Sequence, residues 1–303
     1  MAIDAEIRDP EYLYLKVTNK VLLDRKKTTL TDEQLKNLIR TSIFSYSNLN
    51  LNKFGATFVL SKLQDNIDAV DTNSIRGSET ILRLEKRFEP DLNNSKTYTI
   101  KYDAKLHRGT ILNRLISSEF NVNDSLGTTR TAILEEVPES YTGISSINVT
   151  NAGYGYTSAP IVTITGDGYG ATGTATIVNG KVVSVTITNR GINYTKAVIT
   201  FTGGDGYGAA AVAVLDGRFG TLRTVYFNEL AERQVINSNA GTLDYDTGEV
   251  IIRDLRVLSI STTDGLIRVS IEAENGIISS VRNTIITIDQ TDSTAVATEI
   301  TAV

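Results

Sequence analysis

One pattern occurs twice in the middle of this 303-residue chain, as INVTNAGYGYT at residues 147–157 and as VTITNRGINYT at residues 185–195. Each copy is followed by a similar stretch, IVTITG at 161–166 and VITFTG at 198–203, and then by the sequence DGYGA. The copies start 38 residues apart, at positions 147 and 185. Two tandem copies of one supersecondary unit explain this pattern most simply, and we expect the two halves to pack on each other.

The residue types within each copy indicate short strands and tight turns. Runs such as IVTIT and VVSVTIT are β-branched and suit a pleated surface. Asn179-Gly180 and Asp216-Gly217 are typical of hairpin turns, in which both central residues have positive φ. We therefore predict an inserted all-β module of two repeats at residues 141–217.

The segment before the repeats predicts a domain of mixed structure. Leu13, Leu15 and Val17 alternate with polar positions, which indicates a half-buried strand. Thr31 to Gln34 forms a capping box that predicts a helix as far as about 48–52, and Ser61 to Gln64 predicts a second helix over about 62–70. Further strands are expected at 81–88 and 97–102, and residues 111–120 could be strand or helix.

The segment after the repeats is again rich in strand-forming residues, and residues from about 289 onward are expected to fray or to pack on a neighbour. We predict an α+β fold that is predominantly β. Residues 1–140 supply a domain core with two helices on a small sheet, residues 141–217 the inserted module, and residues 218–303 a β-rich part that completes the core. The strands expected in this last part cover 221–227, 249–252, 255–260, 266–271 and 284–288.

Composition excludes several classes of function. Lys and Arg number 30 against 35 Asp and Glu, so bulk charge does not favour nucleic acid as a partner. The chain has no cysteine, which excludes thiolate nucleophiles and cysteine-ligated metals, and its single histidine, His107, excludes histidine clusters. No run approaches the roughly 18 apolar residues of a membrane helix, so we expect no membrane partner.

The candidate chemical sites each have a simpler interpretation. The Gly-rich turns lack the following helix of a phosphate loop. Asp244, Asp246 and Glu249 do not match the ligand order of a calcium loop and indicate a hairpin turn. His107 is interpreted as a surface or hydrogen-bonded residue. Glu135 and Glu136 would point to opposite faces of a strand, so they cannot flank one glycosidic bond, and we interpret them as a solvated edge. We therefore expect no enzyme activity, cofactor or metal.

Tyrosines concentrate in the repeats and leave two interpretations open. Tyrosine combines a large contact area with a polar tip, which suits protein interfaces and sugar stacking. Beside glycine, it can equally cover bare backbone in a small β module. The residues concerned are Tyr154, Tyr156, Tyr169, Tyr194 and Tyr207.

The outer segments resemble a known family, the ring-forming baseplate wedge subunits of T4-like myoviruses within the baseplate J-like proteins, over their C-terminal half. The resemblance covers residues 5–137 and 218–290, and the repeat module looks like an insertion. The residues that carry it are Leu35, Leu38, Ile39, Ile43, Tyr46 and Leu49, then Lys53-Phe54-Gly55, Phe58, Ser61, Leu63, Ile67-Asp68, Asp71 and Ser74-Ile75, then Ser117-Ser118-Glu119-Phe120 and the stretch from Gly241 to Val250.

This resemblance implies a structural subunit of a contractile phage tail baseplate in the virion, assembled in the host cytoplasm. Such subunits form inter-wedge and ring contacts around the hub and transmit the contraction trigger, with partners that are a second copy of the chain and other wedge or hub proteins. We expect outward contacts from Tyr154, Tyr156, Tyr169 and Tyr207. We expect Leu38, Phe44 and Tyr46 to be shared between the core and an oligomer.

Two other functions remain alternatives. The first is a carbohydrate- or receptor-binding adhesin that uses the Tyr- and Gly-rich repeats. The second, which the residues favour least, is a β-rich polysaccharide lyase or hydrolase, because the sequence lacks an obvious catalytic constellation.

Overall fold

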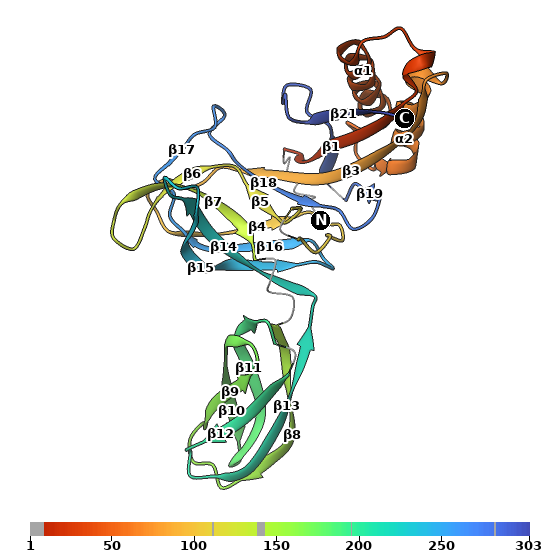
Figure 1. Ribbon diagram of the computed structural model, residues 1–303. Helices are drawn as coiled ribbons and strands as arrows, with labels where there is room; N and C mark the ends of the chain where they lie inside the picture. The colour runs from red at the N-terminus through yellow and green to blue at the C-terminus, as the bar shows by residue number, and fades with distance from the viewer. Residues whose placement is uncertain (1–8, 111, 138–142, 195, 282) are drawn as a thin grey trace, which may run out of the picture.

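The computed structural model describes residues 9–110, 112–137, 143–194, 196–281 and 283–303. Its elements are mainly strands, with α-helices α1 (Asp32–Asn50) and α2 (Leu60–Asp68), which confirms the predicted α+β, predominantly β class. Figure 1 shows a large sheet with the helix pair at one end and a small barrel at the other.

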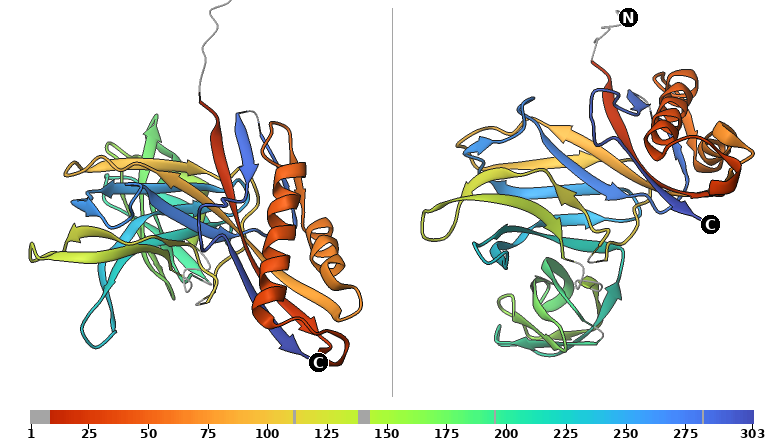
Figure 2. Two further views of the ribbon diagram at one scale, coloured as in Figure 1. Left: turned by 90° about the horizontal axis from the view of Figure 1, so that it is seen from above. Right: turned by 45° about the horizontal axis from the view of Figure 1, so that its top comes forward.

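The N-terminal part is built on two long antiparallel strands, β1 (Glu11–Leu23) and β3 (Ile75–Phe88). The predicted alternation is confirmed, because Leu13, Leu15 and Val17 are all buried. Helices α1 and α2 pack side by side next to these strands (Figure 2). The short 3-10 helices η1 (Arg25–Lys27) and η2 (Ala69–Asp71) lie in the connections.

Helix α1 begins as the sequence predicts. Thr31 is its N-cap, and the Thr31 hydroxyl oxygen accepts a hydrogen bond from the Gln34 backbone N–H at 3.3 Å. The Gln34 side-chain oxygen accepts in turn from the Thr31 backbone N–H at 2.9 Å. This reciprocal pair satisfies two backbone donors of the first turn.

The second capping-box prediction is wrong. Helix α2 begins at Leu60, its N-cap is Val59, and none of the described side chains caps it. Strand β2 (Thr57–Val59) runs directly into the helix, and the Leu60 backbone N–H donates to the Gly276 carbonyl oxygen at 2.7 Å. The Gly276 carbonyl, directly before strand β19 (Ile277–Ser279), therefore anchors the helix start, and Ser61 lies inside the first turn.

The large sheet joins strands from both ends of the chain. Its order in the described residues is β20-β1-β3-β18-β5-β7-β14-β15-β16-β4, with β21 also paired to β1, and β6 paired to β7 and β17. Strands from before and after the barrel are interleaved in this order, so the two outer segments share one core. The bounds are β4 (Lys96–Lys101), β5 (Ile116–Ser117), β6 (Phe120–Asn123), β7 (Thr129–Glu136), β14 (Phe219–Phe227), β15 (Arg233–Asp244), β16 (Glu249–Leu255), β17 (Ser259–Ile260), β18 (Ile267–Glu272), β20 (Thr284–Thr287) and β21 (Val296–Ala302), with β19 (Ile277–Ser279) paired to β2.

Several boundaries differ from the sequence predictions. Residues 111–120 are neither one strand nor one helix, because β5 covers Ile116–Ser117, β6 starts at Phe120, and residue 111 lies outside the described residues. The strand expected at 255–260 reduces to β17 (Ser259–Ile260) after the end of β16. The C-terminal residues do not fray, because β21 pairs in parallel with Val17–Leu23 of β1.

The strands between residues 143 and 216 form a closed barrel in the order β10-β11-β8-β13-β12-β9. The two repeats supply matching triplets: β8 (Gly143–Tyr154), β9 (Ile161–Gly166) and β10 (Tyr169–Val178), then β11 (Lys181–Ile192), β12 (Ala197–Thr202) and β13 (Tyr207–Asp216). Strand β8 pairs with β11, and β9 with β12, so equivalent strands of the two repeats meet across a pseudo-two-fold axis.

The two repeats interlock through tyrosine and glycine. Tyr156 of the first repeat lies where a Cβ at Gly206 of the second repeat would stand, and Tyr194 of the second repeat has the same relation to Gly168 of the first. Both tyrosines are buried. Of the two predicted hairpins, Asn179-Gly180 is confirmed, with φ of 51° and 70°. Asp216-Gly217 instead connects β13 of the barrel to β14 of the sheet, and these strands have different partners.

Candidate interaction surfaces

The outer side of α1 exposes apolar side chains next to buried ones. Leu38 is 46% exposed and Leu49 is 77% exposed, whereas Phe44 is half-buried beneath the Arg40 guanidinium, whose carbon lies 5.3 Å from the ring centre. Tyr46 is buried, and its hydroxyl lies 3.4 Å from the Val59 carbonyl oxygen. The expectation that Tyr46 is shared with an oligomer is therefore wrong, because its ring packs against Phe58 inside the core.

The barrel places its tyrosines in three different surroundings. Tyr154 ends β8 and Tyr207 begins β13, at the end of the barrel away from the large sheet (Figure 1). Both are more than half exposed, their ring centres are 4.2 Å apart in an edge-to-face arrangement, and a hydrogen bond with Tyr154 raises the pKa of Tyr207. Tyr169 is also exposed, at the end that faces the sheet. Tyr156 is buried against Gly206, so the expectation of an outward contact is wrong for this residue.

The expectation of a solvated edge at Glu135 and Glu136 is wrong, since both side chains are fully buried on β7. Glu135 accepts from the Nε atoms of Arg114 at 2.8 Å and Arg223 at 2.7 Å, and the Nε of Arg233 lies 3.2 Å away. Burial of a carboxylate requires such compensation. The alternation of side chains along β7 could not predict that Glu135 binds three arginines, because these arginines are distant from it in the sequence.

Glu136 points to the other face of β7 and holds a different set of groups. Its carboxylate accepts from the Tyr245 hydroxyl and from the backbone N–H groups of Gly109 at 3.1 Å and Leu115 at 3.0 Å. These bonds anchor the loop that precedes β5. The two carboxylates therefore act on opposite faces, as predicted, and both bind groups of the fold.

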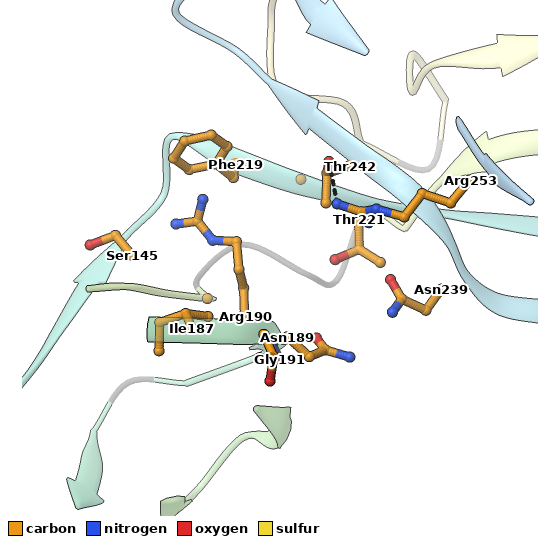
Figure 3. A pocket seen from close by; sticks show the side chains of 13 residues that line it. Ser145, Ile187, Asn189, Arg190, Gly191, Phe219, Thr221, Asn239, Thr242 and Arg253 are labelled. Atoms are coloured by element: carbon orange, nitrogen blue, oxygen red, sulfur yellow. Dashed lines mark hydrogen bonds between the residues drawn. The ribbon is translucent and has the colours of Figure 1, made fainter. Parts of the chain in front are cut away.

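A pocket of about 310 Å³ lies where the barrel meets the sheet (Figure 3). Arg190 of the barrel points toward Phe219 of β14, with its guanidinium carbon 3.5 Å from the ring centre. Arg253 of β16 donates to the Thr242 hydroxyl at 3.3 Å on another wall. A neighbouring pocket of about 290 Å³ is lined by Val137, Tyr169, Gly170, Asn189, Ile192, Thr221, Arg223, Val235, Ser238 and Asn239.

The remaining polar candidates, Asp244 and His107, contact groups of the fold. Asp244 is held by Arg218, with Nη2 2.6 Å from Oδ2; burial alone would raise its pKa, but hydrogen bonds from Arg218 and Thr247 hold the pKa below its ordinary value. The turn at 244–249 joins β15 to β16, as predicted. His107 is half-buried and its backbone N–H donates to the Glu272 carbonyl oxygen at 2.9 Å, while its ring Nδ1 is buried without a hydrogen-bond partner among the described residues.

The part of the chain that the structure describes contains no group of three or more His, Cys, Asp and Glu side chains placed to hold a metal ion. Neither described helix has the length and apolar character needed to span a membrane.

Comparison with known proteins supports the resemblance over part of the chain. Residues 11–87, about a quarter of the sequence, match the family described as baseplate structural protein gp6, C-terminal domain III. A search of curated proteins found no match. The matched segment runs from the first residue of β1 to the next-to-last residue of β3 and includes both helices. The helix pair and the two long strands beside it are therefore similar to domain III of a baseplate structural protein, which supports a phage baseplate protein in the virion tail.

Proposed function

We propose that this protein is a structural subunit of a contractile phage tail baseplate that forms inter-wedge or ring contacts around the hub and transmits the contraction trigger. The single observation that carries the proposal is the match of residues 11–87 to a baseplate structural protein domain. The proposed partners are a second copy of the chain and other wedge and hub proteins, and assembly takes place in the host cytoplasm.

The surface of the matched segment, and of strand β21 that pairs with its first strand, suits such contacts. Leu38 and Leu49 give α1 an exposed apolar character, and neither contributes to the buried core. Strand β21 lies at the edge of the sheet beside β1, and Glu299 is its single charged residue. Edge strands that carry few charges are suited to pairing with another chain.

A dense ion network makes the same region suitable for transmitting force. Glu85 of β3 is buried between the Lys16 Nζ at 2.9 Å and the Arg87 Nε at 2.8 Å. Arg87 also pairs with Asp289 at 2.8 Å, and Arg268 with Asp292 at 3.2 Å. The network therefore ties β1, β3 and β18 to the segment that leads into β21, so these elements would move together.

The test compares a surface variant with a matched control. Leu38→Asp combined with Leu49→Asp changes exposed positions, so the fold should survive while oligomer contacts are lost. Leu230→Asp, at a loop position that is 78% exposed, is the control. Sedimentation should show a concentration-dependent oligomer for the wild type and for the control, but a monomer for the double variant. A wild-type chain that stays monomeric at high concentration and captures no co-expressed baseplate protein would contradict the proposal.

A second candidate function is carbohydrate or receptor binding by the free end of the barrel. The exposed edge-to-face pair of Tyr154 and Tyr207 favours it, because such rings can stack on a sugar. Glycan-array binding by the full chain that is abolished by Tyr207→Ala and retained by Tyr12→Ala would support this function. Absence of saturable binding would leave the barrel as a spacer.

A further inference from the structure

Three arginines converge on Glu135 from segments that are far apart in the sequence. Arg114 precedes β5, Arg223 lies in β14, and Arg233 begins β15. All three approach the carboxylate through Nε, at 2.8, 2.7 and 3.2 Å. This arrangement uses one nitrogen of each guanidinium for Glu135.

The cluster carries more positive charge than its carboxylate can compensate. Three guanidinium groups share the one buried Glu135 carboxylate, so its single negative charge does not compensate both Arg223 and Arg233. Within the described residues, the terminal nitrogens of Arg223 and Arg233 make no hydrogen bond. The acidic neighbour Glu232 accepts instead from the Asn228 side chain at 2.9 Å. The Arg233 side chain is 33% exposed, and the Arg223 side chain is 15% exposed and lines the neighbouring pocket, so a group from solution can reach both guanidinium groups.

The pocket beside the cluster has an apolar character that limits the choice of ligand. Arg223 forms part of the wall of the 290 Å³ pocket, together with Val137, Ile192, Tyr169 and Val235. Tyr169 and Val235 are both more than half exposed. A ligand that fills this pocket would combine an apolar group with an anionic group, which describes a polypeptide segment better than a free phosphate or a nucleic acid backbone.

We propose that the arginine cluster and this pocket bind an acidic segment of a neighbouring protein, with a carboxylate on Arg223 and Arg233 and an apolar side chain in the pocket. Guanidinium groups recognise carboxylates through paired, charge-assisted hydrogen bonds. The inference rests on the proposed function only for the origin of the segment, a second baseplate protein.

The experiment measures binding of a fluorescent peptide to the full chain by anisotropy. The probe is a hexapeptide of glutamate and leucine, and its matched control replaces each glutamate with glutamine. We expect saturable binding of the acidic peptide that weakens as salt increases. Arg223→Gln and Arg233→Gln should each weaken it roughly tenfold, as loss of one charged hydrogen bond would. Arg130→Gln is the matched control. Arg130 lies on the same strand as Glu135, and its Nε pairs with Asp124 at 2.9 Å, so this variant also removes an arginine–carboxylate pair but should leave binding unchanged.

Three results would overturn the inference: equal binding of the glutamine peptide, unchanged binding by both arginine variants, or competition by inorganic phosphate as strong as by the acidic peptide. Arg114 and Arg233 still compensate Glu135 when Arg223 is replaced, so we expect Arg223→Gln to fold. If it does not fold, Arg233→Gln, at the more exposed position, tests the inference by itself. A chain that assembles with baseplate proteins but does not bind the peptide contradicts this inference alone. A chain that binds the peptide but assembles with nothing contradicts the proposed function.

Discussion

At the scale of single residues, buried charges in this protein join segments that are distant in the sequence. Glu135 gathers Arg114, Arg223 and Arg233, and Glu85 of β3 pairs with Lys16 of β1. A buried ion that loses its partners is costly, because its desolvation is no longer compensated. These carboxylates therefore act as junctions between strands.

Replacing Glu135 with alanine tests this role. We expect Glu135→Ala to lower the free energy of unfolding by about 3 kcal/mol, because three guanidinium groups would lose their common carboxylate. Urea denaturation measures the change. Glu249→Ala is the matched control, since its pair with Lys101 is exposed and contributes less than about 1 kcal/mol. Equal effects of the two substitutions would show that Glu135 is not a junction.

The aspartates near the C-terminus make stability depend on pH. Burial alone would raise the pKa of Asp289, but hydrogen bonds from Thr291 and Arg87 outweigh it and lower the pKa. The pKa of Asp292 is also lowered, because hydrogen bonds from Thr294 and the charges of Lys16 and Arg268 outweigh burial. Their stabilisation is therefore fully present above the pKa of an unfolded aspartate, about 3.9, and is lost as the pH falls through the lower folded pKa.

We expect the free energy of unfolding to fall steeply below about pH 4. Asp289→Asn should destabilise the protein at neutral pH, and its difference from the wild type should stay constant from about pH 6 to about pH 5 and shrink from there to about pH 2. Thermal unfolding over this range measures both effects. A difference that stays constant with pH would contradict the assignment.

At the scale of elements, the two helix starts show that one sequence motif can have two outcomes. The motif at Thr31 caps α1, whereas the similar motif at Ser61 falls inside α2, because β2 leads straight into the helix. We expect Thr31→Ala to cost about 1 kcal/mol of stability, as loss of an N-cap does. Ser61→Ala should change it by less than about 0.5 kcal/mol. Denaturation of both variants measures the contrast, and a larger loss for Ser61→Ala would overturn it.

At the scale of the whole molecule, the barrel and the large sheet have separate hydrophobic cores. The core of the barrel contains residues from 144 to 215, and the core of the sheet contains none of the residues between 143 and 217. The chain leaves and re-enters the sheet at neighbouring points, because the Val137 backbone N–H donates to the Thr221 carbonyl oxygen at 2.9 Å. We therefore propose that the barrel is an inserted domain that the rest of the chain does not need for folding.

Removing the barrel tests this proposal. Joining Val137 to Arg218 through a short Gly-Ser linker should leave a folded protein, because β7 and β14 already pair beside the junction. Circular dichroism during heating should show one cooperative transition for the shortened chain. The intact chain should show an additional transition that belongs to the barrel. A shortened chain that unfolds without cooperativity would contradict the proposal.

The sequence by itself predicted the features that depend on neighbours along the chain. The alternation at Leu13 to Val17, the capping box at Thr31 and the hairpin at Asn179-Gly180 all follow from local geometry. The repeat predicted two halves that pack on each other, because similar units expose similar apolar faces that one unit alone cannot bury. These signals were sufficient for the fold class.

Only the tertiary structure decided which segments meet. Strands from before and after the barrel are interleaved in one sheet, and this order buries Glu135 among three arginines whose positions in the sequence give no sign of contact. Tyr156 is buried for a similar reason, since the bare backbone that it covers belongs to Gly206 of the other repeat. Burial and ion pairing are properties of contacts between distant segments, so the period of side chains along one strand cannot determine them.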